Sequence, residues 1–127
     1  MEGTIITNNP MVRDAYANRY NTEFRAASYE ALLKEVRNLV HLGARLLTHP
    51  LYGSVKPHET PYRSVLLETG TGRTDAESVA LIENALLSAK KFRNKAASYD
   101  ADLLKDCQTV DLSLFESAMY AMEQRPI

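Results

Sequence analysis

Short apolar runs alternate along this chain with stretches in which apolar side chains recur every three or four positions. The apolar runs lie at residues 4–7, 44–47 and 63–68, and a weaker one at 23–27 rests on Phe24. Runs of this length, rich in β-branched and other apolar residues, are typical of buried strands. The sequence therefore predicts about four strands.

The periodic stretches predict amphipathic helices with one apolar side. In the clearest of them, Ser28 is the expected N-cap and Gly43 the left-handed residue just past the end. A long helix is expected after Asp75. A shorter one is expected after Asn9, an N-cap residue, with Pro10 in its first turn. Its expected inner face consists of Val12, Ala15 and Tyr16.

The C-terminal part of the chain is also helical by pattern. A short segment is expected after Asp100 and a final helix after Asp111. Strands and helices then alternate as β-α-β-α-β-loop-β-α-α. This order predicts an α/β fold, with a small, mainly parallel sheet of about four strands, helices on both faces and a C-terminal helical pair. The direction of the fourth strand stays open, because its connection is just long enough for a parallel crossover.

Composition narrows the class of protein. A chain of 127 residues is expected to form a single domain, residues 1–127. Fifteen basic and sixteen acidic residues leave a net charge of −1, so no broad field attracts nucleic acid or an anionic membrane. The single cysteine, Cys107, forms no internal disulfide, and no apolar run is long enough to span a bilayer. We expect a cytoplasmic protein with no cofactor and no nucleic-acid or membrane partner.

Polar residues directly follow the first and third predicted strands. In a parallel sheet, ligands bind beyond the carboxyl ends of the strands. If these two strands are neighbours, both turns open onto one crevice, and the helix that begins at Pro10 directs free backbone N–H groups toward an anion there. The proline-rich loop that follows adds further polar groups, and Lys56 and Arg63 are cations that pair with carboxylates or phosphates. The predicted anion-binding residues are Thr7, Asn8, Asn9, Thr48, His49, Ser54 and Lys56. The alternative is that Asn8 and Asn9 only form a turn and a helix cap.

His49 is the candidate catalytic residue, because it titrates near neutral pH and comes directly after a strand. The alternative is a histidine that only holds its loop through a hydrogen bond to the backbone. His49, His58 and Glu59 are metal-ligand types, but their spacing matches no metal motif, so we expect no metal site.

Several of these segments resemble the GrdX family, small proteins encoded beside glycine and betaine reductase genes in anaerobic bacteria. The resemblance is carried by IITNNP at 5–10, VRNLVHLG at 36–43, LLTHPLYGSVKP at 46–57, PYRSV at 61–65 and LIENA at 81–85. It implies an accessory role in anaerobic amino-acid metabolism, in a cytoplasmic setting with a substrate pool rich in carboxylates and phosphates. It supplies no catalytic residues.

Three functions follow from the residues and the resemblance together. The first is a non-catalytic accessory protein that binds a small anionic ligand at the strand ends. The second is an enzyme in which His49 acts as general acid or base on a phosphoryl or acyl group. The third is an interaction module whose C-terminal helices dock on a reductase subunit or on a second copy. The third predicts an exposed apolar patch around Phe115, Met119 and Met122.

Overall fold

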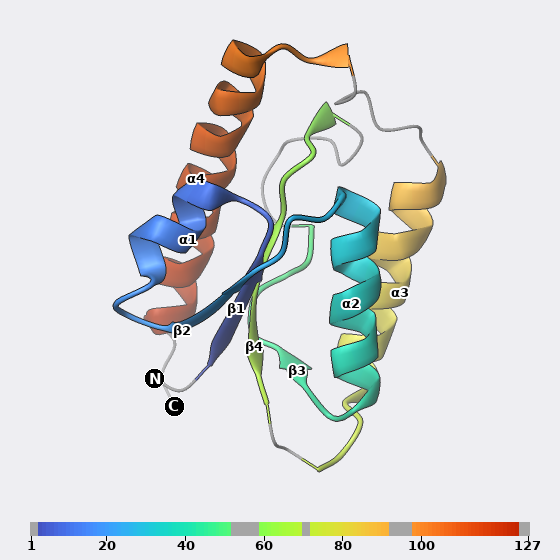
Figure 1. Ribbon diagram of the computed structural model, residues 1–127. Coiled ribbons are helices and arrows are strands. Elements are labelled where there is room, and N and C mark those ends of the chain that lie inside the picture. The colour runs from blue at the N-terminus through green and yellow to red at the C-terminus, as the bar shows by residue number, and fades with distance from the viewer. Residues whose placement is uncertain (1–2, 52–58, 70–71, 92–97, 125–127) are drawn as a thin grey trace.

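The computed structural model describes residues 3–51, 59–69, 72–91 and 98–124. Over these residues the chain forms one four-stranded sheet and four helices (Figure 1). In chain order the elements are β1 (Thr4–Thr7), α1 (Pro10–Tyr16), β2 (Asn21–Phe24), α2 (Tyr29–His41), β3 (Arg45–Leu46), β4 (Ser64–Glu68), α3 (Ala76–Lys91) and α4 (Ala101–Glu123).

The sheet is mixed, with strand order β2-β1-β4-β3. β1 and β2 are parallel, whereas β4 runs antiparallel to both of its neighbours, β1 and β3. The prediction of a mainly parallel sheet is therefore wrong. The assumed adjacency of the first and third strands is wrong as well, because β4 lies between them.

The direction of β4 follows from where its connection begins and ends. Just past β3, Leu47 N donates to Leu66 O at 2.9 Å, and Thr48 Oγ1 accepts a hydrogen bond from Leu66 N at 3.0 Å. The chain thus leaves β3 and enters β4 at the same edge of the sheet. A parallel β4 would require the chain to travel back along the sheet, which normally uses a helix, and residues 48–63 show no helical period.

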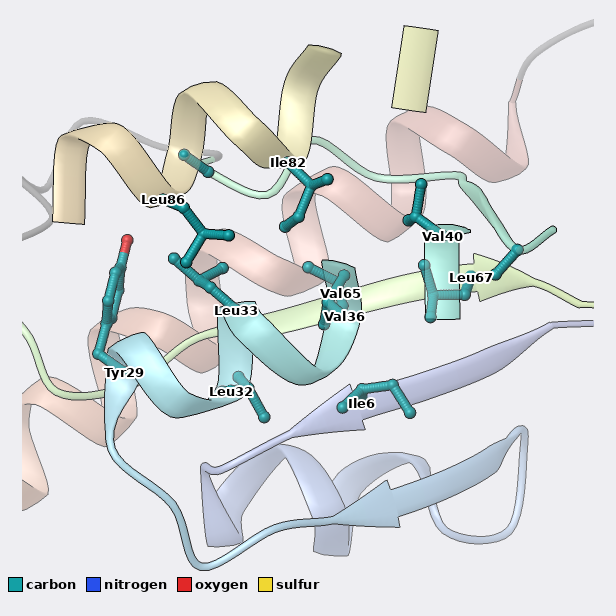
Figure 2. Packing of buried hydrophobic residues seen from close by; sticks show 12 residues of the cluster. Ile6, Tyr29, Leu32, Leu33, Val36, Val40, Val65, Leu67, Ile82 and Leu86 are labelled. Atoms are coloured by element: carbon teal, nitrogen blue, oxygen red, sulfur yellow. The ribbon is translucent and has the colours of Figure 1, made fainter. Parts of the chain in front are cut away.

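Helices cover both faces of the sheet, as predicted. α2 and α3 lie on one face, and α1 and α4 lie on the other (Figure 1). The alternation of side chains along β4 divides the core accordingly: Val65 and Leu67 pack with α2 and α3, whereas Leu66 packs with α1 and α4. Figure 2 shows the first of these two cores, in which Leu33, Val36 and Ile82 meet above the sheet.

The predicted N-caps of α1, α2 and α3 and the predicted glycine at the end of α2 are confirmed. Asn9 Oδ1 accepts a hydrogen bond from Met11 N, and Ser28 Oγ accepts one from Ala31 N. Asp75 caps α3 through Ser78 N at 3.0 Å, and Gly43 follows α2 with a φ of 107°. These features depend only on residues a few positions apart.

Three local predictions need correction. The second strand, predicted at 23–27, begins at Asn21 and ends at Phe24, which is two residues earlier at its start and three at its end. Ala15 is exposed, so only Val12 and Tyr16 form the inner face of α1. The short segment expected after Asp100 and the final helix expected after Asp111 are one continuous helix, α4, because no proline or glycine interrupts its sequence.

The apolar residues predicted to form an exposed patch, Phe115, Met119 and Met122, are not exposed. Phe115 is fully buried, and Met119 and Met122 are buried beside it in the core under α1. Tyr16 packs edge-on against Phe115, with ring centroids 5.4 Å apart. These side chains therefore join α4 to α1 and are not available to a partner.

Candidate functional site

The predicted binding residues gather at one edge of the sheet, which we call the strand-end rim. There β1 and β2 end and β4 begins, with Thr7 paired to Phe24 on one side and to Ser64 on the other. β3 also ends toward this edge, with Thr48 just beyond it. The two turns thus reach the same edge of the sheet, although β4 separates their strands.

Thr7 and Asn9 belong to a buried polar network that connects β1, β4 and α4. Thr7 Oγ1 lies 2.6 Å from Ser64 Oγ and accepts a hydrogen bond from Asn9 N at 2.9 Å. Asp111 Oδ2 accepts hydrogen bonds from Asn9 Nδ2 at 3.0 Å and from Ser64 Oγ at 3.1 Å. Asn9 Nδ2 also donates to Gln108 O at 3.0 Å. These polar groups therefore bind one another, and they hold α4 against the rim.

Asn8 and Thr48 are also engaged with the protein's own backbone. Asn8 Nδ2 donates to Ala27 O and Pro61 O, and its Oδ1 accepts a hydrogen bond from Arg63 N at 2.8 Å. Thr48 Oγ1 accepts the hydrogen bond from Leu66 N described above. Asn8 thus ties the end of β1 to the segment that enters β4.

His49 has an exposed side chain just past β3. Its Nδ1 accepts a hydrogen bond from Leu51 N at 2.9 Å, which is a loop-holding contact to the backbone. This leaves Nε2 as the nitrogen that carries the proton in the neutral ring. Ser54, Lys56 and His58 lie outside the described residues, so ligand contact by Ser54 and Lys56 stays a prediction.

The start of α1 already has a carboxylate close to it. Asn9 Oδ1 caps Met11 N, while the Nδ2 of the same side chain binds Asp111 Oδ2. Like-charge repulsion from this carboxylate disfavours a second anion at the helix start. An anion expected at the strand-end rim therefore needs a positive group other than the backbone of α1.

A pocket of about 180 Å³ opens beside the rim, between the segment that enters β4 and the outer side of α4. We call it the α4 pocket. One wall is formed by residues just before β4, namely Glu59, Thr60 and Arg63. The other wall is formed by Leu103, Asp106, Cys107, Val110, Asp111 and Leu114 of α4. None of the predicted binding residues that the structure describes lines it, but Asn9 touches its wall through Asp111.

Arg63 is the cationic group among these lining residues, and it is only 2% exposed. Its guanidinium carbon lies 5.4 Å from the centre of the Tyr29 ring, a cation–π arrangement. Burial raises the pKa of the Tyr29 hydroxyl, an effect that Arg63 partly offsets. The cation is thus held in a fixed place at the wall of the pocket.

The single thiol of the chain also lines the pocket. Burial raises the pKa of Cys107, and the negative charge of Asp106 raises it further. Because the thiolate is the reactive form, Cys107 is a weak nucleophile near neutral pH. The described residues contain no group of three or more His, Cys, Asp or Glu side chains placed to hold a metal ion. Within the same residues, no helix is long and apolar enough to cross a bilayer.

Arg63 is recognisable from the sequence as a cation near the site, but Asp111 is not recognised there as a site residue. The sequence pattern places Asp111 just before a final helix, whereas it lies within α4 and is 4% exposed. The signal was present in the spacing, because Asp111 falls on the same helical stripe as Phe115, Met119 and Met122. A carboxylate on an apolar stripe is rarely buried without polar partners.

Comparison with known proteins gives one match. The family model described as GrdX-like protein matches residues 4–120. The matched range contains the strand-end rim and every described residue of the α4 pocket. No curated protein and no solved structure matches the chain.

Proposed function

The chain belongs to the GrdX-like protein family, and from that membership and the α4 pocket we propose that it is a non-catalytic accessory protein of glycine or betaine reduction. In this role it binds a small carboxylate- or phosphate-bearing ligand at the strand-end rim. The pocket beside the rim receives the ligand, and Arg63 contacts its anionic group. The ligand thus binds near the location predicted from the sequence, but its anionic group contacts the pocket wall and not the start of α1.

The observation that carries the proposal is the placement of Arg63 in the wall of an open pocket. Guanidinium groups form paired, charge-assisted hydrogen bonds to carboxylates and phosphates. Burial strengthens such a contact, because the local dielectric constant is lower than that of water. A fixed, buried cation beside a cavity is therefore suited to recognising an anionic group.

Binding is favoured over catalysis by the two residues that are candidates for chemistry. Cys107 lines the pocket, but its raised pKa keeps the thiol protonated near neutral pH. His49 is exposed, does not line the pocket, and uses Nδ1 to hold its own loop. The described part of the pocket thus shows no nucleophile paired with a base, as acyl or phosphoryl transfer through a covalent intermediate requires.

Cys107 can report on ligand binding, because it is the only cysteine of the chain and lies in the pocket wall. We would measure its alkylation by iodoacetamide with and without phosphate, acetyl phosphate, 4-methylpentanoate and L-leucine, together with calorimetric titrations. A bound ligand should slow alkylation at the concentrations at which it binds. If none of these compounds binds or protects Cys107 at high millimolar concentration, the proposal is wrong.

Two variants and their matched controls locate the site. Arg63→Gln should lower affinity for the anionic group at least tenfold, whereas Arg13→Gln, at a half-exposed arginine in α1, should not. Val110→Trp should fill the mouth of the pocket, whereas Thr109→Trp places the same side chain at an exposed neighbouring position outside it. Equal binding by the Val110→Trp and Thr109→Trp variants would mean that the ligand binds elsewhere.

A further inference from the structure

One side of α3 is exposed along the length of the helix. α3 packs mainly against α2, and Figure 1 shows it at the edge of the molecule. Its exposed residues lie on one side, because they recur every three or four positions after a neighbouring pair at the start. We call them the α3 stripe, and they are Ala76, Glu77, Ala80, Asn84, Leu87 and Lys90.

Two apolar residues of different size lie in the middle of the α3 stripe. Leu87 is 66% exposed, whereas its neighbour Leu86 is 2% exposed and belongs to the core between α2, α3 and the sheet. Ala80 is also exposed and lies seven residues before Leu87, which is about two helical turns. A single exposed leucine is ordinary, but the small Ala80 on the same side leaves room for a large side chain of another helix.

The positions of these residues suit a second copy of the same helix. Ala80 and Leu87 are equally distant along α3 from the midpoint between residues 83 and 84, and so are Glu77 and Lys90. A two-fold axis at this midpoint places Leu87 opposite Ala80 of the second copy, in an antiparallel helix pair. The same register places Glu77 opposite Lys90 of the second copy. Because of the symmetry, each of these contacts occurs twice.

The two charged residues of this register are accessible to a partner. Glu77 and Lys90 are exposed, and neither takes part in the ion pairs of the described residues. Glu77 lies in the first turn of α3 and Lys90 lies near its end. Parallel pairing of two such helices would bring like charges together at both ends, which costs binding energy. Antiparallel pairing brings opposite charges and opposite ends of the two helix dipoles together.

We infer that the α3 stripe is a self-association surface, through which two copies of this chain pair with their α3 helices antiparallel. Leu87 packs onto Ala80 of the second copy, and Glu77 forms an ion pair with Lys90 of the second copy. The contact is one helix wide, so the dimer is weak and reversible. It is separate from the α4 pocket, because α3 and α4 cover opposite faces of the sheet (Figure 1).

Sedimentation equilibrium of the full chain, from about 1 μM to about 1 mM, tests the inference. The wild type should form a reversible dimer. Leu87→Glu should weaken it at least about tenfold, because a central apolar contact is lost twice. Leu103→Glu makes the same substitution at a 42% exposed leucine of α4, and it should leave the dimer unchanged. A wild type that stays monomeric refutes the inference, and so does a dimer that Leu87→Glu does not weaken more than Leu103→Glu does.

Charge reversal tests the register. Glu77→Lys alone and Lys90→Glu alone each bring like charges together in the dimer, so each should weaken it about tenfold. An equal mixture of these two variants should form a heterodimer nearly as stable as the wild-type dimer, because opposite charges meet again at both ends. Both positions are exposed, so both variants should fold, which circular dichroism checks.

Asp102→Lys is the matched control for the mixture, because it makes the same change of charge in the first turn of α4. Mixed with Lys90→Glu, it should not restore association. If the Glu77→Lys and Lys90→Glu variants dimerise like the wild type, the ion pair does not form and the inference is wrong. The same conclusion follows if their mixture associates no better than the control mixture.

Discussion

Substitution of Asp111 by alanine tests whether the buried polar network holds α4 to the sheet. The carboxylate accepts hydrogen bonds from Asn9 Nδ2 and Ser64 Oγ. Asn9 precedes α1 and Ser64 begins β4, and both are far from Asp111 in the sequence. It is 4% exposed, so water does not readily replace it in the folded protein. The substitution removes the acceptor and leaves both donors in place.

The size of the effect follows from what each donor retains. Asn9 Nδ2 keeps its bond to Gln108 O, and Ser64 Oγ keeps its contact with Thr7 Oγ1. A hydrogen bond to a charged group contributes about 1.5–3 kcal/mol, and a buried donor left without a partner costs about 1–3 kcal/mol. Because both donors keep one partner, we expect Asp111→Ala to lower the free energy of unfolding by about 2–4 kcal/mol. The higher helix propensity of alanine offsets less than ~1 kcal/mol of this loss.

Urea unfolding at neutral pH, with the midpoint and the m-value both fitted, measures this change in stability. Asp106→Ala is the control, because it makes the same substitution at an exposed position of the same helix and gains the same helix propensity. It should change the free energy of unfolding by no more than about 0.5 kcal/mol. If the two variants differ by less than ~1 kcal/mol, the network does not hold α4 in place and the reasoning is refuted.

Three further predictions concern the core, a helix end and a tyrosine. Phe115→Ala should lower the free energy of unfolding by about 3–5 kcal/mol, because the fully buried ring leaves a cavity beside Tyr16, and a loss below ~2 kcal/mol in urea unfolding would contradict the packing. Gly43→Ala should cost about 1–2 kcal/mol in the same assay, because the φ of 107° strains a residue with a Cβ, and unchanged stability would argue against that φ. Burial and the hydrogen bond to Glu123 raise the pKa of Tyr20 to about 12, so its contribution to stability is present below its unfolded pKa, near 10, and is lost as the pH rises through 12. Urea midpoints measured across this range should therefore fall more steeply for the wild type than for Tyr20→Phe, and parallel curves would contradict the shift.

The parts of the fold that the sequence predicts well are set by residues close together along the chain. Ser28 and Gly43 mark the limits of α2, and the apolar stripe between them faces the core as expected. Asn9 caps α1 through Met11 N, a contact between residues two positions apart. Such signals are local, because a cap or a positive φ needs only the few residues of one turn.

The position of β4 could not be predicted in the same way. Val65, Leu66 and Leu67 are buried on both faces of the sheet. An apolar run of this kind predicts that helices cover both faces, but it does not indicate which strands lie beside it. The order β2-β1-β4-β3 depends on the connection before β4, which begins and ends at the strand-end rim. That path is a property of tertiary structure and leaves no periodic signal in the sequence.

The candidate site shows the same division between local and distant information. The sequence predicts polar side chains at the ends of β1 and β3, and the structure places Thr7, Asn9 and Thr48 at one edge of the sheet. Whether such groups face a ligand or the protein itself is decided by their partners. For Asn9 the partner is Asp111, which is 102 residues away in the sequence. Ligand contact by the predicted residues stays a prediction, and the α4 pocket is the opening that the structure adds beside them.

The two halves of α4 differ in a way that relates stability to binding. From Asp111 onward the helix carries its buried residues, including Phe115 and Met119, and these anchor it to α1 and the sheet. Before Asp111 its residues are exposed or half-buried, and this half supplies Leu103 and Cys107 to the pocket wall. Because one wall of the pocket is α4 itself, a ligand can bind only while the helix is docked. Binding must therefore stabilise the docked helix, by about 2.7 kcal/mol when the ligand is at 100 times its dissociation constant.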